Sequence, residues 1–361
     1  MLPVNFDVSL KAWLALSLTR GLGGESARRL LKEFGSPDAV FAASISSLKS
    51  IVKPDAAAEI KKGIADDALA PALAWLEDDN NHIVTLADSD YPQALLNIPD
   101  PPLLLYVKGQ LGLLNQAALA IVGSRSATPQ GIHNAEAFAK SLSDAGLCII
   151  SGLAHGIDAA AHRGALRGRG GSIAVVGTGL DKVYPAANRD LAHALAQQGT
   201  LVSEFPLGTA PLAANFPRRN RLISGLGLGC LVVEASLQSG SLITARLALE
   251  QGREVFAIPG SIHAPQSKGC HALLKQGAKL VETAHDILEE LGGQLVSPAQ
   301  RASSEGPDSA LLEHLGFDPV DADTLSVRCG LTIAELSAML LTLELDGRIS
   351  ALPGGLYQRI H

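Results

Sequence analysis

Cysteine is scarce in this sequence, and its placement excludes a disulfide-stapled fold. Among 361 residues there are only four cysteines, and no two form a CxxC pair: Cys148, Cys230, Cys270 and Cys329. Cysteines this far apart indicate reduced, buried thiols, so we expect a cytosolic protein. Although His263 and His271 lie near Cys270, their spacing matches no zinc pattern.

Long hydrophobic runs are also missing. The apolar run AWLALSL at residues 12–18 is too short to cross a bilayer, and Asp7, Lys11 and Arg20 flank it. Because no small-residue cleavage site follows, we expect a packed helix rather than a signal peptide, and no membrane partner.

Nucleotide and catalytic motifs are absent as well. GTGLDK (177–182) lacks the third glycine of the G-x-G-x-x-G fingerprint, and GSRSATPQG (123–131) fits neither that pattern nor a Walker loop. There is no G-x-S-x-G nucleophile elbow. His155, Asp158 and His162 invite a metal hypothesis, but Asp158 suits a helix N-cap and a histidine on an alanine-rich face usually packs or hydrogen-bonds. We therefore predict no cofactor and favour capping and packing over a metal site.

Charge is low and unevenly distributed. The chain has 29 Lys and Arg against 36 Asp and Glu, a net charge of −7, and only 18% of its residues are charged. Such a chain does not coat nucleic acid indiscriminately. Residues 120–280, however, carry 15 basic and 9 acidic side chains, whereas 1–119 and 281–361 are acidic, at −4 and −9. This basic island, which includes FPRRNR (216–221), can hold an anionic ligand at one place.

The length and the apolar content of the chain predict two or three domains with an apolar core. Residues 1–70 predict short helices, and the glycines of GLGG (21–24) leave open a DNA-binding helix-hairpin-helix or an ordinary turn in a small bundle. Within residues 71–291, β-rich runs alternate with helical patterns, which predicts a doubly wound, mostly parallel α/β sheet buried on both faces. The predicted strands are 82–87, 103–109, 118–124, 147–152, 172–179, 200–205, 230–236, 254–260 and 278–283.

The C-terminal part is predicted to be a separate small domain. GGQLVSPAQRASSEGPDS (292–309) has the composition of a linker. Residues 310–361 predict three helices and a hairpin that turns at Pro353-Gly354-Gly355. Three helices and such a wing make a winged helix.

Several predicted strands in the basic island end in loops of glycine and small polar residues. Glycine lets the backbone approach an anion closely, and the start of the following helix supplies oriented N–H groups. Arg125, Lys182 and the arginines of 218–221 add positive charge to the same rim. Because ligands of such folds gather at the carboxyl ends of the strands, we predict a phosphate-binding rim. Its small members are Gly123, Ser124, Ser151, Gly152, Gly177, Gly179, Ser239, Gly240, Ser241 and Thr244.

These motifs occur together in a known family. Over residues 82–291, the ordered series IVGSRSATPQG, SGLAHGIDAAAHRGAL, VVGTGLDKVYP, FPRRNRLISGL, VVEASLQSGSLITARLALEQG and KGCHALLKQGAKLV resembles the DNA-processing protein A (DprA/Smf) family. The resemblance implies a cytoplasmic protein with a Rossmann-like core that binds single-stranded DNA, usually as a homodimer. It implies help in loading the RecA recombinase during natural transformation, and no catalysis. The helical start and the winged-helix end resemble accessory domains of the family.

The resemblance also implies individual DNA contacts. They are Arg125, Lys182, Phe216, Arg218, Arg219, Asn220, Arg221, the turn Ser239–Gly240–Ser241, and Lys268. Phe216 is the candidate for stacking a base, unless it is a core residue at a helix start. Arg218 and Arg221 are expected to clamp phosphates, although Arg221 could instead hold its own loop through a carboxylate such as Glu204 or Glu234. For Arg219 the alternative is a surface ion pair, and Asn220 is expected to orient an arginine. His271, where the family often has asparagine, has no assigned role.

Two other functions are compatible with parts of the sequence. A Rossmann-like nucleotide hydrolase needs PGGxGTxxE, whereas SGSLITARLALE has the glycine and Thr244 but lacks the PGG and the correctly spaced glutamate. A protein-interaction scaffold would use the winged helix as its adaptor. Because LTIAELSAMLLTLELDGR carries Glu335, Glu344 and Asp346 against Arg348, its charge opposes phosphate binding, and we favour a protein-contact or autoinhibitory role for this domain.

Overall fold

The computed structural model describes residues 8–292, 311–312, 314–315, 319–346, 348–352 and 354–359. The chain divides into two compact units. Met1–Asp79, Ile83–Leu105 and Arg301–His361 form the first, and Asn80–His82 with Tyr106–Gln300 form the second, which we call the sheet unit. The predicted linker lies outside the described residues, apart from Gly292.

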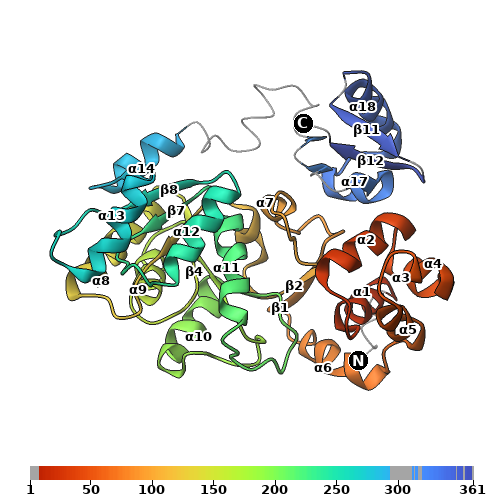
Figure 1. Ribbon diagram of the computed structural model, residues 1–361, viewed down its shortest axis with the longest axis horizontal. Helices are drawn as coiled ribbons and strands as arrows, with labels where there is room; N and C mark the ends of the chain where they lie inside the picture. The colour runs from red at the N-terminus through yellow and green to blue at the C-terminus, as the bar shows by residue number, and fades with distance from the viewer. Residues whose placement is uncertain are drawn as a thin grey trace. The chain divides into compact units, whose positions relative to one another are not determined.

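A nine-stranded, mostly parallel sheet carries the central part of the chain (Figure 1). Its strands follow the order β1-β2-β6-β5-β4-β3-β7-β8-β9, in which β2 pairs antiparallel with β6 and the strands from β6 to β9 pair in parallel. The predicted doubly wound α/β fold is confirmed, since each of the nine predicted strands overlaps one of the sheet. The strands are β1 Asn81–Thr85, β2 Leu104–Gly109, β3 Ala118–Val122, β4 Cys148–Ser151, β5 Ser172–Val175, β6 Thr200–Ser203, β7 Gly229–Val232, β8 Glu254–Ala257 and β9 Lys279–Leu280.

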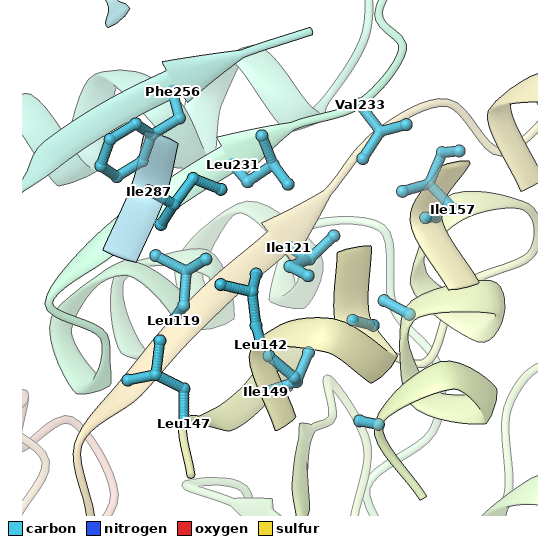
Figure 2. Packing of buried hydrophobic residues seen from close by; sticks show 14 of the residues in the cluster. Leu119, Ile121, Leu142, Leu147, Ile149, Ile157, Leu231, Val233, Phe256 and Ile287 are labelled. Carbon is cyan, nitrogen blue, oxygen red and sulfur yellow. The ribbon is translucent and has the colours of Figure 1, made fainter. Parts of the chain in front are cut away.

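Helices cover both faces of this sheet. β3, β4, β5 and β7 are buried along their whole length, as expected for strands with helices on both sides. Figure 2 shows Leu119 and Ile121 of β3 packed with Leu231 of β7 and Leu142 of α8 in one apolar cluster. The helices are α8 Pro129–Asp144, α9 Ile157–Ala165, α10 Arg189–Gln198, α11 Asn215–Leu226, α12 Ser241–Glu250, α13 Lys268–Lys275 and α14 Ala284–Leu291, with 3-10 turns η1 Leu111–Asn115, η2 Ala186–Asn188 and η3 Pro265–Ser267.

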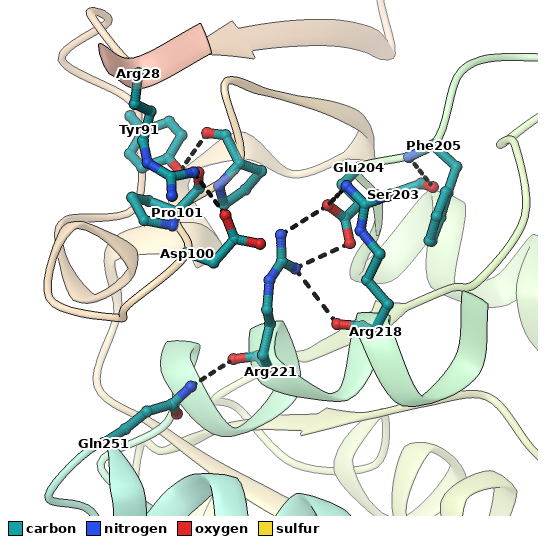
Figure 3. Close-up of polar contacts among 11 residues, drawn as sticks. Arg28, Tyr91, Asp100, Pro101, Ser203, Glu204, Phe205, Arg218, Arg221 and Gln251 are labelled. Atoms are coloured by element: carbon teal, nitrogen blue, oxygen red, sulfur yellow. Dashed lines mark hydrogen bonds and ion pairs between the residues drawn. The ribbon is translucent and has the colours of Figure 1, made fainter. Parts of the chain in front are cut away.

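The N-terminal residues form a small helical bundle, as predicted. Its helices are α1 Val8–Leu18, α2 Gly24–Phe34, α3 Pro37–Ala42, α4 Ile45–Lys49, α5 Pro54–Lys62 and α6 Asp66–Trp75, and the short α7, Gln93–Leu96, follows β1. Arg28 of α2 donates to the Asp100 carboxylate at 2.7 Å and to the Pro101 carbonyl at 2.8 Å (Figure 3). A Cβ on Gly24 would lie 3.3 Å from the same carboxylate. The Arg28 guanidinium, paired with this carboxylate, would lie 3.2 Å from the same Cβ, so the ion pair fills the space beside the first residue of α2 and favours the ordinary turn over a DNA-binding hairpin.

The C-terminal residues form a small separate core with a three-stranded sheet of order β10-β12-β11. Its elements are β10 Val320–Asp321, α17 Ala322–Cys329, α18 Ile333–Leu345, β11 Ile349–Leu352 and β12 Leu356–Arg359. The wing hairpin is confirmed, and the described residues of the first predicted helix, Leu311, Leu312, His314 and Leu315, are helical.

Within the described ranges, no single helix is long and apolar enough to cross a membrane. One bent pair, Ala322–Cys329 with Ile333–Leu345, meets length and composition criteria only when its two helices are taken together.

Candidate nucleic-acid interface

The carboxyl ends of the parallel strands form a cleft where the strand order reverses. From β3 the chain runs outward through β4, β5 and β6, then returns to β7 on the other side of β3. Open α/β sheets bind ligands at such a switch point. The cleft measures about 710 Å³, and it is lined by the loop after β3, the loop after β7 and the start of α11. Eight predicted contact residues line it: Ser124, Arg125, Phe216, Arg219, Asn220, Ser239, Gly240 and Ser241.

The loop that carries Arg125 is fixed by a glutamate at the end of β7. The Ser124 N–H donates to the Glu234 carbonyl at 2.7 Å. The Glu234 carboxylate accepts from the Thr128 N–H at 2.9 Å and from the Thr128 hydroxyl at 2.5 Å. Gly131 is required here, because a Cβ would lie 2.3 Å from the carboxylate carbon. Arg125 therefore extends, exposed, from a rigid loop.

Phe216 lies in the first turn of α11 and is only partly buried. The Asn215 amide donates to the Gly177 carbonyl at 3.0 Å, which ties this turn to the end of β5. A Cβ on Gly177 would lie 3.1 Å from the Phe216 ring, so the glycine leaves room for the ring. Phe216 therefore lines the cleft, and its side chain is partly packed against the protein and partly accessible from the cleft.

Two guanidinium groups and a second aromatic ring surround Phe216. The Cζ atoms of Arg125 and Arg219 each lie 5.9 Å from its ring centroid, within the range of a cation–π contact. The Tyr184 ring lies 5.6 Å away, centroid to centroid, at an interplanar angle of 41°. The cleft therefore combines positive charge with aromatic surface, the pairing that binds a sugar-phosphate chain and its bases.

Arg219 is buried rather than on the surface, so the surface ion pair expected as its alternative is wrong. Its side chain is only 4% exposed, because it points under the cleft toward the ends of β4 and β5. One guanidinium nitrogen, Nη1, donates to the Gly152 carbonyl at 2.8 Å and also to the Val175 carbonyl. A Cβ on Gly152 would lie 2.7 Å from the guanidinium. Gly152, predicted as a phosphate contact, is therefore a buried residue that makes room for an arginine.

Asp158 balances the charge of Arg219. Burial raises the pKa of Asp158, and the nearby Arg219 charge and the N–H groups of Ala154 and Gly152 oppose that rise. Burial likewise lowers the pKa of Arg219 to about 10, with Asp158 acting against the shift and Arg125 adding to it. The Arg219 guanidinium stays charged at neutral pH, so the floor of the cleft carries an arginine and a carboxylate together.

Arg218 and Arg221 share one carboxylate at the end of β6 (Figure 3). Arg221 makes a bidentate pair with Glu204, at 2.9 and 2.8 Å, and Arg218 reaches the same group at 3.0 Å. The Glu204 side chain is 3% exposed and that of Arg221 is 11% exposed, whereas that of Arg218 is 56% exposed. The alternative in which Arg221 holds Glu204 is thus the arrangement observed. Arg218 alone of this pair presents its charge to solvent.

The remaining predicted positions lie on the rim or outside the cleft. Lys182 is exposed and donates to the Gly208 carbonyl at 2.5 Å, and Lys268 is exposed at the start of α13. In the described part of the chain, neither lysine lines the cleft, and neither do Gly152, Arg218 or Arg221.

The histidine and cysteine side chains form no metal site within the residues that the structure describes. His162 is fully buried, its Nδ1 atom lies 2.8 Å from the Ser172 hydroxyl, and burial lowers its pKa to about 3. Asp158 does not cap α9, contrary to expectation. Gly156 is the N-cap, and the Asp158 carboxylate instead accepts from Gly152 N–H at 3.2 Å and Ala154 N–H at 3.3 Å, because the preceding loop folds back over it. Burial is confirmed for three free cysteines and is partial for the fourth, which is Cys329.

Sequence reasoning missed one prominent member of the cleft. Tyr184 is 47% exposed and contacts Phe216, whereas in the loop VVGTGLDKVYP (175–185) only the glycines and the lysine are predicted to contact the ligand. An aromatic residue in a loop that follows a strand of the basic island was the available signal.

Comparison with known proteins agrees with this geometry. Residues 82–292 match the family model described as DNA recombination-mediator protein A. The chain belongs to this family. Residues 296–355 match the model of the DprA winged helix domain. Protein Smf of Escherichia coli (strain K12) is 46% identical over 299 residues, which cover 80% of each chain.

Solved structures resemble the same region. The DNA processing protein A (DprA) structure from Streptococcus pneumoniae superposes with a TM-score of 0.70 and 38% identity, covering 78% of this chain and 97% of that one. A Helicobacter pylori DNA processing protein A, whose structure was described for its single-stranded DNA binding mode, gives a TM-score of 0.54 and 30% identity. It covers 59% of this chain and 96% of its own.

Proposed function

We propose that this protein binds single-stranded DNA in the cleft between β3 and β7. The observation that carries the proposal is the group around Phe216, in which two guanidinium groups and a half-exposed tyrosine ring surround a half-buried phenylalanine. Phosphates supply the anionic partner for Arg125, and bases supply the flat apolar partner for the rings. The name of the Helicobacter pylori structure, which specifies single-stranded DNA binding, supports the same ligand class.

A duplex is a poor fit to this site. Its bases are stacked on each other and unavailable to aromatic side chains, whereas a single strand can turn its bases outward. We therefore expect the full chain to shift a single-stranded oligonucleotide at concentrations that leave a hairpin-free duplex of equal length unbound. A gel mobility shift across a salt series makes the comparison. Equal affinity for the two forms at every salt concentration would contradict the proposal.

We infer that the protein acts by binding rather than by catalysis. Among the described residues, Asp158 is the one acidic side chain that lines the cleft, and its carboxylate accepts hydrogen bonds from the Gly152 and Ala154 N–H groups. Because its side chain is only 8% exposed and is bonded to the backbone of its own loop, it is poorly placed to reach a glycosidic bond of a substrate in the cleft. Incubation with nucleoside monophosphates should release no free base, and release would favour a nucleotide hydrolase instead.

Two partners follow from the family and belong to the same proposal. We expect a second copy of this chain and the RecA recombinase, to which the protein would deliver its bound strand during transformation. Light scattering at tens of micromolar should give a mass above that of the monomer. Purified RecA should assemble faster on a single strand bound by this protein than on the same strand without it. A strict monomer would contradict the expected self-association, and an unchanged RecA assembly rate would contradict the expected delivery to RecA.

The winged helix supports a second, compatible role as a protein contact. Ile333, Leu341 and Leu345 of α18 are 45%, 59% and 80% exposed, and Glu344 and Asp346 lie at the end of the same helix. An apolar and acidic helix face suits another protein better than a DNA backbone. Full-length Leu341→Gln should keep its affinity for single-stranded DNA and lose affinity for purified RecA. A loss of DNA affinity alone would assign the helix to DNA instead.

A further inference from the structure

Tyr184 has an unusual placement for a large aromatic residue. It lies between β5 and η2, in a loop fixed by hydrogen bonds from the Thr178 hydroxyl to the Lys182 carbonyl and from the Asn188 amide to the Leu153 carbonyl. Its side chain is nevertheless 47% exposed. In the described part of the chain its hydroxyl has no hydrogen-bond partner. The ring, rather than the hydroxyl, is the feature that this loop presents to the cleft.

The two rings of the cleft lie side by side. A base inserted between parallel rings needs them about 7 Å apart, twice the ~3.5 Å contact distance of carbon atoms. The centroids of Tyr184 and Phe216 are 5.6 Å apart and their planes are tilted by 41°, so the rings are in contact with each other. A single base therefore cannot be sandwiched between them. Each ring can offer a face to a different base.

The spacing of the rings suits a single strand. Successive nucleotides of a duplex strand rise only ~3.4 Å along the axis. Two bases stacked on rings 5.6 Å apart and tilted must unstack from each other, which a single strand permits and a paired duplex resists. Stacking on two rings also requires no hydrogen bonds to base edges, so it tolerates any sequence.

We propose that Tyr184 is a second stacking residue, and that it and Phe216 hold two neighbouring bases of one single strand. The inference rests on the proposed single-stranded DNA site. It adds to that site a second stacking residue, and it specifies that two bases are held. It also gives the cleft a means of selecting single strands that does not depend on phosphate charge.

The test uses two probes that differ only in their bases. One is a short oligothymidylate, and the other is an abasic sugar-phosphate chain of the same length, which has phosphates and nothing to stack. The full-length variants are Tyr184→Ala, Tyr184→Phe, Phe216→Ala and the double variant Tyr184→Ala/Phe216→Ala. Leu249→Ala is the matched control, because Leu249 is also 47% exposed but lies outside the cleft lining.

Tyr184→Ala should weaken oligothymidylate binding by about 5- to 150-fold, the effect of one base–aromatic stack, and should leave abasic binding within about twofold of wild type. Tyr184→Phe and Leu249→Ala should bind both probes like wild type. The double variant should bind oligothymidylate more weakly than either single variant, because each ring holds its own base.

Other outcomes overturn the inference. If the double variant is no weaker than Phe216→Ala, Tyr184 only supports the other ring. If Tyr184→Ala loses abasic binding equally, the loop has been disturbed or the contact is to phosphate. If wild type binds neither probe, the proposed function itself fails, and the result is distinguishable from a failure of the tyrosine alone.

Discussion

Replacement by alanine should have different effects at the two arginines that share Glu204. Loss of Arg221 should lower stability, whereas loss of Arg218 should weaken DNA binding. Arg221 is 11% exposed and bidentate to a carboxylate that is 3% exposed, so Arg221→Ala leaves a buried charge with only Arg218 as its partner. Breaking a buried pair costs about 3–5 kcal/mol, and we expect about 3 because Arg218 remains. For a unit of this size, that lowers the melting temperature by about 6–12 °C.

Arg218→Ala should have little effect on stability and a clear effect on the affinity for single-stranded DNA. Its guanidinium is 56% exposed, and an exposed ion pair contributes only about 0.2–1 kcal/mol. If Arg218 neutralises one phosphate, its removal makes the slope of log K against log salt shallower by about 0.7 for a single strand. Arg221→Ala should leave that slope unchanged, because the Arg221 side chain is only 11% exposed and does not present its charge to a phosphate.

Calorimetry and a salt titration of single-strand affinity on the same variants make the comparison. Glu204→Gln combined with Arg221→Ala is the control, and it should recover part of the stability lost by Arg221→Ala because no unpaired charge remains buried. If Arg221→Ala instead melts like wild type and shows the shallower slope, Arg221 is a phosphate ligand and the division of roles is refuted.

Three further outcomes follow from the same geometry. Phe216→Ala should weaken single-strand binding by about 1–3 kcal/mol while the salt slope stays unchanged, because stacking releases no counterions; a changed slope in the titration would contradict this. Gly152→Ala places a methyl group 2.7 Å from the Arg219 guanidinium and should cost about 1–3 kcal/mol in denaturant unfolding; unaltered stability would show that the arginine moves freely. Burial lowers the pKa of His162 to about 3, below its ordinary 6.5, so between those pH values the unfolded chain binds a proton that the folded chain does not. Wild-type unfolding free energy should therefore fall as pH drops below about 6.5, by up to ~1.4 kcal/mol per pH unit, and urea titrations of His162→Gln should lack this component.

The sequence specified the strands of the core well and the roles of the arginines poorly. Each predicted strand is a short run between turn residues, and burial of the central strands on both faces leaves their apolar runs little choice of structure. FPRRNR, by contrast, places three arginines within one helical turn. Arg219 points into the protein, Arg221 toward Glu204 and Arg218 toward solvent. These directions depend on the rotation of the helix and on the carbonyl and carboxylate groups at the ends of other strands.

Glycine positions were misread for a related reason. The glycines at the ends of β4 and β5 were expected to let the backbone approach an anion. In the structure Gly152 makes room for Arg219, and Gly177 makes room for Phe216. Sequence marks a place where no side chain fits, but only the packed neighbours show whether the space is filled by ligand or by protein.

The central claim is that the cleft between β3 and β7 holds the bases of a single strand, and photocrosslinking tests it most directly. An oligonucleotide carrying 5-iodouracil, bound to the full-length protein and irradiated, attaches to aromatic side chains that stack on the modified base. Mass spectrometry of the digested protein should then find the label on Tyr184 and Phe216. Label confined to residues 319–359 or 8–75, with none on the sheet unit, would place the strand elsewhere and contradict the account.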